Sequence, residues 1–133
     1  MIITSEQEML DFGENVGKNL QTNIIELVGD VGAGKTTFAR GLAKGLGIKE
    51  PVTSPSFTIS KTYAAPNGKK LVHYDFYRLK DPGIMAEDLE ESLSDPNSII
   101  LVEWADSVAD FLPKGHQRIT IKYLDDGTRE VTL

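Results

Sequence analysis

Eight consecutive residues, Gly29 to Thr36, read GDVGAGKT and satisfy the pattern G-x-x-x-x-G-K-[ST] in full. They follow a short apolar run, Ile24–Val28, and precede residues with helical periodicity. A strand that passes through a glycine-rich turn into a helix is the setting in which this pattern binds phosphate. The feature therefore predicts an α/β fold with a parallel sheet and a nucleoside triphosphate as ligand.

The residue types in this loop explain the expected chemistry. Glycines allow backbone N–H groups to converge on phosphate oxygens, and the positive end of the following helix adds to the attraction. Lys35 is expected to reach the terminal phosphates and to act in catalysis, and Thr36 to ligate Mg²⁺. The sequence thus predicts ATP or a related nucleotide together with Mg²⁺.

Two acidic residues are candidates for the catalytic partners of the loop. A second apolar run, Ile99–Val102, ends in Glu103, which is placed to hold the magnesium ion through its waters. Asp75 lies at or near the end of another predicted strand, where it would orient water or a magnesium-bound water. The sequence leaves open which of the two carboxylates positions the attacking water.

Several nearby residues have two interpretations. His73 is either structural or active near Asp75, and Trp104, the only tryptophan, is expected to pack rather than to act. Arg78 either contacts phosphate or covers an acid. Hydroxyls in the proline-rich loop either respond to a γ-phosphate or cap the loop itself; they belong to Thr53, Ser54, Ser56 and Thr58. The acidic segment 87–92 is read as a solvated helix face, with a docking surface as the alternative.

Periodicity and turn residues predict alternating helices and strands along one domain, residues 1–133. We expect an α/β fold like that of P-loop NTPases, with three layers, a mainly parallel central sheet and added β-hairpins. The predicted helices cover Ser5–Leu20, where Ser5 and Glu8 have the form of a capping box, Lys35–Leu46, Pro82–Leu93 with Asp81 as N-cap, and Asp106–Leu112. The predicted strands cover Ile24–Val28, Phe57–Tyr63, Leu71–Tyr77, Ile99–Val102, Arg118–Leu124 and Arg129–Leu133, with Pro51–Ser56 as an ordered loop. The turn Asp125-Asp126-Gly127 is predicted to join the last two strands in a hairpin.

Composition narrows the class of protein. The chain has 133 residues and a net charge of −6, from 14 basic and 20 acidic side chains, which argues against gripping nucleic acid without partners. It has no cysteine, so a disulfide framework and thiolate metal sites are excluded. There is no apolar run of membrane-spanning length and no secretory signal, so we expect a cytoplasmic protein without a membrane partner.

Four segments occur in a specific order: GDVGAGKTTFARG, TSPSFT, HYDFYRL and LVEWAD. With them the chain closely resembles the TsaE (YjeE) family of small bacterial ATPases over most of its length. The resemblance implies a part in making threonylcarbamoyladenosine beside the anticodon of tRNA. It also implies binding to the transferase TsaD and to TsaB, with ATP hydrolysis permitting repeated rounds of modification and tRNA held by the other subunits.

The resemblance also implies site residues. It places Mg²⁺ on Thr36 and Glu103, a required aspartate at Asp75, and nucleotide contacts at Gly32, Ala33, Gly34, Lys35, Thr36 and Thr37. Further nucleotide contacts would come from the N-terminal segment and the C-terminal hairpin, near Glu6, Gln7 and Arg129. In two respects the chain departs from the family: Ser56 stands where threonine is usual, and the sequence stops at Leu133, before a tail that some members carry.

Three other activities are compatible with a phosphate loop. A small-molecule kinase would use Asp75 as base, but the chain has only four arginines and no arginine-rich insertion for a lid. A nucleotide-dependent binding module would use the bound state rather than hydrolysis. A GTPase is disfavoured because an N-K-x-D element is lacking.

Overall fold

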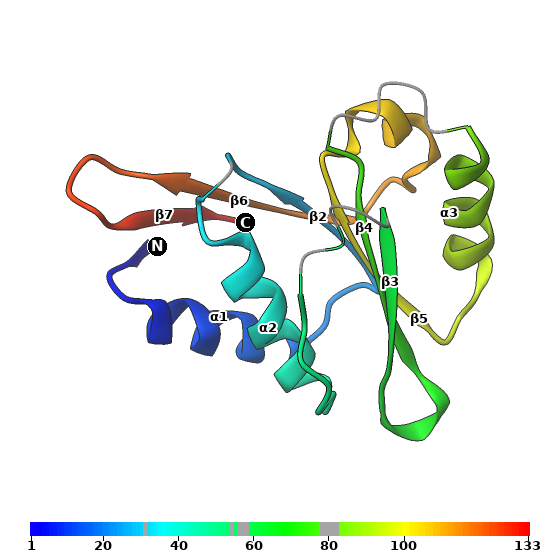
Figure 1. Ribbon diagram of the computed structural model, residues 1–133, viewed down its shortest axis with the longest axis horizontal. Coiled ribbons are helices and arrows are strands. Elements are labelled where there is room, and N and C mark those ends of the chain that lie inside the picture. The colour runs from blue at the N-terminus through cyan, green and yellow to red at the C-terminus, as the bar shows by residue number, and fades with distance from the viewer. Residues whose placement is uncertain (31, 54, 56–58, 78–82) are drawn as a thin grey trace.

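The computed structural model describes residues 1–30, 32–53, 55, 59–77 and 83–133. Its sheet has seven strands in the order β1-β7-β6-β2-β5-β4-β3 (Figure 1). The strands are β1 (Ile2–Ile3), β2 (Ile24–Val28), β3 (Ser60–Ala64), β4 (Lys70–Asp75), β5 (Ser98–Glu103), β6 (Gln117–Tyr123) and β7 (Arg129–Thr132). The helices are α1 (Glu6–Lys18), α2 (Lys35–Gly45) and α3 (Ile84–Ser94), with 3-10 segments η1 (Pro66–Gly68) and η2 (Ala105–Phe111).

The four central strands, β6, β2, β5 and β4, are parallel, and the outer strands pair antiparallel to their neighbours. The parallel core and both predicted hairpins, β3–β4 and β6–β7, are confirmed, and the whole sheet is mixed. β2 and β5 are almost entirely apolar because layers cover both of their faces. The phosphate loop therefore follows β2 directly, and β2 is a central, covered strand of the sheet.

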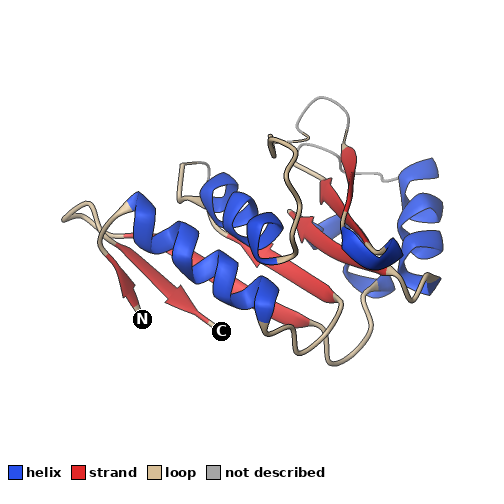
Figure 2. Cartoon of the chain, turned by 90° about the horizontal axis from the view of Figure 1, so that it is seen from below, coloured by secondary structure: helices blue, strands red, loops and turns tan. Residues whose placement is uncertain are grey.

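Helices lie on both faces of the sheet, as expected for three layers. α1 and α2 lie side by side on one face (Figure 2), over a core that includes Ile25, Leu27 and Leu101. α3 and η2 cover the other face, where Leu89 and Val108 pack with Val72, Tyr74, Ile100 and Val102. Within the described residues, none of the helices combines the length and apolar character needed to cross a bilayer.

The contact between α1 and α2 is made by backbone as well as by side chains. A Cβ added at Gly41 would lie 2.3 Å from the Leu10 carbonyl oxygen, and one at Gly45 would lie 2.2 Å from the Glu14 carbonyl oxygen. Only glycine permits such an approach at these two positions. Beside the contact, the rings of Phe12 and Phe38 pack 5.6 Å apart.

Several predicted boundaries differ from the structure, and one strand was not predicted. The strand predicted at Leu71–Tyr77 corresponds to β4, which ends at Asp75. The helix predicted at Asp106–Leu112 is the 3-10 segment η2, which begins at Ala105 after a left-handed Trp104 (φ 55°). The strand predicted at Phe57–Tyr63 corresponds to β3, which begins at Ser60 after Ile59 with a φ of 67°; the predicted start, Phe57, lies outside the described residues. β1 was not predicted, since its two residues form a strand only by pairing with β7.

Other predictions fall partly outside the described residues. α3 begins at Ile84 with Gly83 at its N-cap, whereas the predicted cap Asp81 and first residue Pro82 lie outside that part of the chain. The same holds for Arg78 and for the loop residues Ser54, Ser56 and Thr58. At the start of α1, Ser5 caps the helix as predicted, because its hydroxyl accepts a hydrogen bond from the Glu8 amide at 3.1 Å.

Candidate nucleotide-binding site

The phosphate loop leaves the sheet at the end of β2 and enters α2 without a side-chain cap. Gly34, at the N-cap, has a φ of 108°, a conformation that favours glycine. The Phe38 amide donates to the Gly34 carbonyl at 3.0 Å, and this bond begins the helical ladder. The amides of the first turn, Lys35 to Thr37, therefore precede the ladder and are placed to receive an anion at the helix N-terminus.

Asp75 and Glu103 come together because of strand register. They are paired positions on the parallel strands β4 and β5, and each is the last residue of its strand. Glu103 is also paired with Leu27 of β2, one residue before the end of that strand. Because parallel strands end at one edge of the sheet, both carboxylates lie beside the start of the phosphate loop.

Glu103 holds a buried network of charged and polar groups. Its Oε1 lies 3.6 Å from Lys35 Nζ, and its Oε2 forms a short hydrogen bond with His73 Nε2. All three side chains are at most 8% exposed. Lys35 Nζ also lies 4.3 Å from the centre of the Trp104 ring, a cation–π contact. Trp104 is thus in the site and not only packing.

Asp75 is held by backbone groups and carries a burial penalty. Its Oδ1 accepts from the Tyr77 amide at 2.9 Å, and its own amide donates to the Ile59 carbonyl at 2.7 Å. Burial raises the pKa of Asp75, and the nearby Glu103 adds to this, while the Tyr77 amide, His73 and Lys35 act in the opposite sense. The left-handed Ile59 is therefore bonded, through its carbonyl, to the backbone of a candidate catalytic residue.

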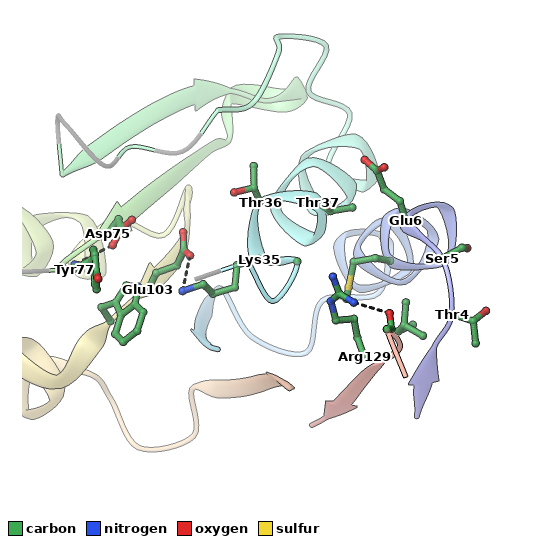
Figure 3. Close-up of a pocket in the computed structure, with 16 residues that line it drawn as sticks. Thr4, Ser5, Glu6, Lys35, Thr36, Thr37, Asp75, Tyr77, Glu103 and Arg129 are labelled. Carbon is green, nitrogen blue, oxygen red and sulfur yellow. Dashed lines mark hydrogen bonds and ion pairs between the residues drawn. The ribbon is translucent and has the colours of Figure 1, made fainter. Parts of the chain in front are cut away.

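These groups line one cavity of about 920 Å³, which is large enough for a nucleotide (Figure 3). Asp75, Glu103 and Lys35 lie at one end, and Glu6 and Arg129 at the other. Of the predicted site residues, the cavity is lined by Gly32, Gly34, Lys35, Thr36, Thr37, Asp75, Glu103, Glu6 and Arg129. The folded chain thus gathers residues from five separate parts of the sequence.

Two predicted contact residues lie outside the lining. The Gln7 side chain is directed along α1, where its amide donates to Asp11 Oδ1 at 2.9 Å. Ala33 is buried beneath the loop, and its carbonyl accepts from Arg129 Nε at 3.0 Å. Arg129 also donates to the Gly127 carbonyl at 2.7 Å and lies over the Tyr123 ring. Arg129 therefore links the C-terminal hairpin to the phosphate loop.

Further lining residues were not predicted from the sequence. Tyr77 packs against Trp104 with 4.8 Å between ring centres, and the rest are Ile3, Thr4, Ser5, Met9 and Gly127. Ser5 had a signal only as a helix cap, and Gly127 only as a turn residue. Their place in the cavity depends on the β1–β7 pairing and on the α1–α2 contact, neither of which has a local sequence pattern.

The oxygen donors in the cavity suit Mg²⁺. Thr36 offers a hydroxyl, and Glu103 and Asp75 offer carboxylates, which are the hard oxygen ligands that this ion prefers. Within the described part of the chain, no group of three His, Cys, Asp or Glu side chains forms a metal cluster. Mg²⁺ in P-loop proteins takes its other ligands from phosphate and water, so these donors fit the ion.

A second buried glutamate, Glu26 of β2, lies on the opposite face of the sheet from Glu103. It pairs with His116 Nε2 at 2.9 Å and with Arg118 at 3.3 Å. The other ring nitrogen of His116 lies 2.7 Å from the Pro113 carbonyl. None of these three side chains lines the cavity. This cluster, Glu26 with His116 and Arg118, had no signal in the sequence.

Comparison with known proteins gives consistent matches over most of the chain. Residues 3–131 match the family model described as "TsaE: Threonylcarbamoyl adenosine biosynthesis protein TsaE". Two relatives are called "tRNA threonylcarbamoyladenosine biosynthesis protein TsaE". The one from Bacillus subtilis is 42% identical, over 84% of this chain and 68% of its own. The one from Treponema pallidum is 36% identical, over 97% of this chain and 95% of its own.

A solved structure agrees with these matches. The crystal structure of Bacillus subtilis YdiB superimposes with a TM-score of 0.80 at 33% identity. The match covers 98% of this chain and 80% of that one. The α/β fold and the sequence relationship therefore point in the same direction.

Proposed function

The chain belongs to the TsaE family of tRNA threonylcarbamoyladenosine biosynthesis proteins, and from that premise we propose that it binds and hydrolyses ATP with Mg²⁺ in this pathway. The proposal rests above all on one observation. The phosphate loop shares a cavity of about 920 Å³ with the carboxylates that end β4 and β5. We propose that the protein acts in the cytoplasm and that tRNA is the molecule that finally receives the modification.

The residues of the cavity have distinct roles in this proposal. Lys35 would exchange its contact with Glu103 for the terminal phosphates, since its present 3.6 Å separation is an ion pair rather than a tight hydrogen bond. The amides at the start of α2 would bind the phosphate oxygens. Thr36 and Glu103 would hold Mg²⁺, and the bound ion would offset the negative charge of the phosphates.

Asp75 and Glu103 remain the two candidates for positioning the attacking water. Both line the cavity, and Glu103 already has one oxygen paired to His73 and the other to Lys35. Asp75 keeps one oxygen, Oδ1, on the Tyr77 amide. We propose that Asp75 orients water while Glu103 serves the metal, because Glu103 ends the strand next to β2 and Asp75 lies one strand further away.

We further propose that the chain acts with TsaB and TsaD, and that hydrolysis resets this complex between rounds of modification. The net charge of −6 supports an arrangement in which tRNA is held by those partners. Weak hydrolysis by the isolated chain and faster hydrolysis in the complex are expected.

Reconstitution with TsaB, TsaD and tRNA tests the proposal. Lys35→Ala should allow no more than about one round of modification per complex, while circular dichroism shows that the variant is folded. Arg118→Gln is the matched control, since it removes one positive charge on the other face of the sheet. Multiple rounds with Lys35→Ala would contradict the proposed role of hydrolysis.

Two further measurements separate the other activities: complex formation with TsaB and TsaD in different nucleotides, and a screen of metabolites for phosphorylation. Equal complex formation in ATP, ADP and a non-hydrolysable analogue would show that the nucleotide is not a switch. A phosphorylated metabolite formed with stoichiometric ADP would instead identify a kinase.

A further inference from the structure

The two carboxylate oxygens of Glu103 have different partners. Oε2 bonds to His73, which is 1% exposed and comes from the neighbouring strand β4. Among the described residues, the partner of Oε1 is Lys35 of the phosphate loop, in an ion pair of 3.6 Å. One oxygen is therefore held by the rigid sheet, and the other by a group that the proposed function requires to move.

His73 itself is held in one orientation. It lies two residues before Asp75 on β4, so both side chains are on the face that carries Glu103. Its other ring nitrogen, Nδ1, is buried and has no hydrogen-bond partner among the described residues. Since a carboxylate only accepts hydrogen bonds, the proton of the ring belongs on Nε2, and a bare Nδ1 is the less costly atom to leave unpaired.

We propose that His73 is a positioning residue for the magnesium site: it anchors Oε2 of Glu103 so that Oε1 is presented to the cavity when Lys35 leaves. This inference rests on the proposed function, because it assumes that nucleotide draws Lys35 away and that Mg²⁺ follows. Without His73, the Glu103 side chain would be free to turn after losing Lys35, and the metal would lose a fixed acceptor.

The chain contains its own control for this inference. His116 also bonds to a buried glutamate, Glu26, at 2.9 Å, but neither residue lines the cavity. Substituting either histidine removes a histidine–carboxylate bond, so general effects of such a loss are shared. Only the loss at His73 should change the response to magnesium.

The test measures binding of a non-hydrolysable ATP analogue by calorimetry while Mg²⁺ is varied. For His73→Leu, the magnesium concentration at half effect should rise about 10- to 100-fold, the range for lost partners of metal ligands. Binding without Mg²⁺ is measured for each variant as its own baseline, so that only the response to the ion is compared. His73→Gln should recover most of the response, since its amide offers an N–H near the position of Nε2, and His116→Leu should match the wild type.

The outcomes separate the inference from the proposed function. If Mg²⁺ has no effect on analogue binding by the wild-type chain, the proposed function fails and this inference with it. If the wild type responds and His73→Leu responds equally, the inference alone is overturned. Nitrogen NMR of the wild-type imidazole needs no variant: a proton on Nε2 supports the inference, and a proton on Nδ1 alone overturns it.

Discussion

Glu103 and Glu26 are both buried glutamates on neighbouring central strands, and each pairs with one histidine and one basic side chain. Glu103 ends β5 and lines the cavity, whereas Glu26 lies within β2 on the opposite face of the sheet. Both ring nitrogens of His116 have hydrogen-bond partners, whereas in the part of the chain that the structure describes only Nε2 of His73 has one. The same residue types thus form a cluster that lines the cavity in one place and a cluster away from the cavity in the other. The two glutamates differ in that Glu103 is the last residue of its strand, whereas Glu26 lies within its strand.

The largest expected contrast concerns turnover. Glu103→Gln should lower ATP hydrolysis about 100- to 1000-fold, the usual loss when a preorganised electrostatic group is removed. Glu26→Gln, the same change in the second cluster, should stay within about twofold of the wild type because it is remote from the cavity. Phosphate release at saturating ATP and Mg²⁺ measures both. Equal losses of ATP hydrolysis in the two variants would show that Glu103 has no role in turnover beyond that of any buried glutamate.

The next contrast is within the Glu26 cluster and concerns the free energy of unfolding. Glu26→Gln should cost about 1.5–3 kcal/mol, the range for hydrogen bonds to charged groups. Arg118→Gln should cost less than about 1 kcal/mol, because the Arg118 side chain is 66% exposed and its ion pair is screened by water. Urea unfolding of both variants gives the two values. An unchanged free energy of unfolding in Glu26→Gln would mean that the Glu26 cluster does not stabilise the fold.

The smallest expected contrast is in how the stability of the fold depends on pH through two aspartates, Asp75 in the cavity and Asp95 outside it. Burial raises the pKa of Asp75, so the folded state holds this proton more tightly and loses stability as pH rises through that raised range. The Asn97 amide, the Ser98 hydroxyl and Lys70 lower the pKa of Asp95, so it contributes stability that disappears as pH falls below the ordinary aspartate value.

Near neutral pH, therefore, Asp75→Asn should raise the melting temperature slightly, and Asp95→Asn should lower it. Both differences from the wild type should shrink toward zero in acid. Thermal unfolding followed across the acid to neutral range measures these signs. A fall in melting temperature for Asp75→Asn at neutral pH would show that its carboxylate is a net stabilising group, as Asp95 is expected to be.

The sequence was informative where one local pattern decides the outcome. The phosphate loop, the parallel core strands and the position of Glu103 at a strand end were all readable from residues near one another. The roles of these residues toward nucleotide and metal stay predictions. A strand end beside a phosphate loop is a strong constraint because register brings such residues to one edge.

The rest depends on contacts between distant residues. The Glu26–His116 bond joins residues 90 apart, and β1 exists only through β7 at the other end of the chain. Ile59 is β-branched and was predicted to be extended, yet its φ is 67°; its amide donates to the Pro55 carbonyl and its carbonyl accepts from the Asp75 amide. His73 had one usable signal, its spacing of two from Asp75, which places both side chains on one face of a strand.

The glycine contact between α1 and α2 has a mechanical consequence. With backbone against backbone at Gly41 and Gly45, the two helices have no compressible side chains between them at those points and should move as one rigid body. α2 carries Lys35 and Thr36, and α1 follows the N-terminal residues that line the far end of the cavity. Any change in the shape of the cavity would then come from the Tyr77–Trp104 side, where we expect amide hydrogens to exchange faster than those of the paired helices.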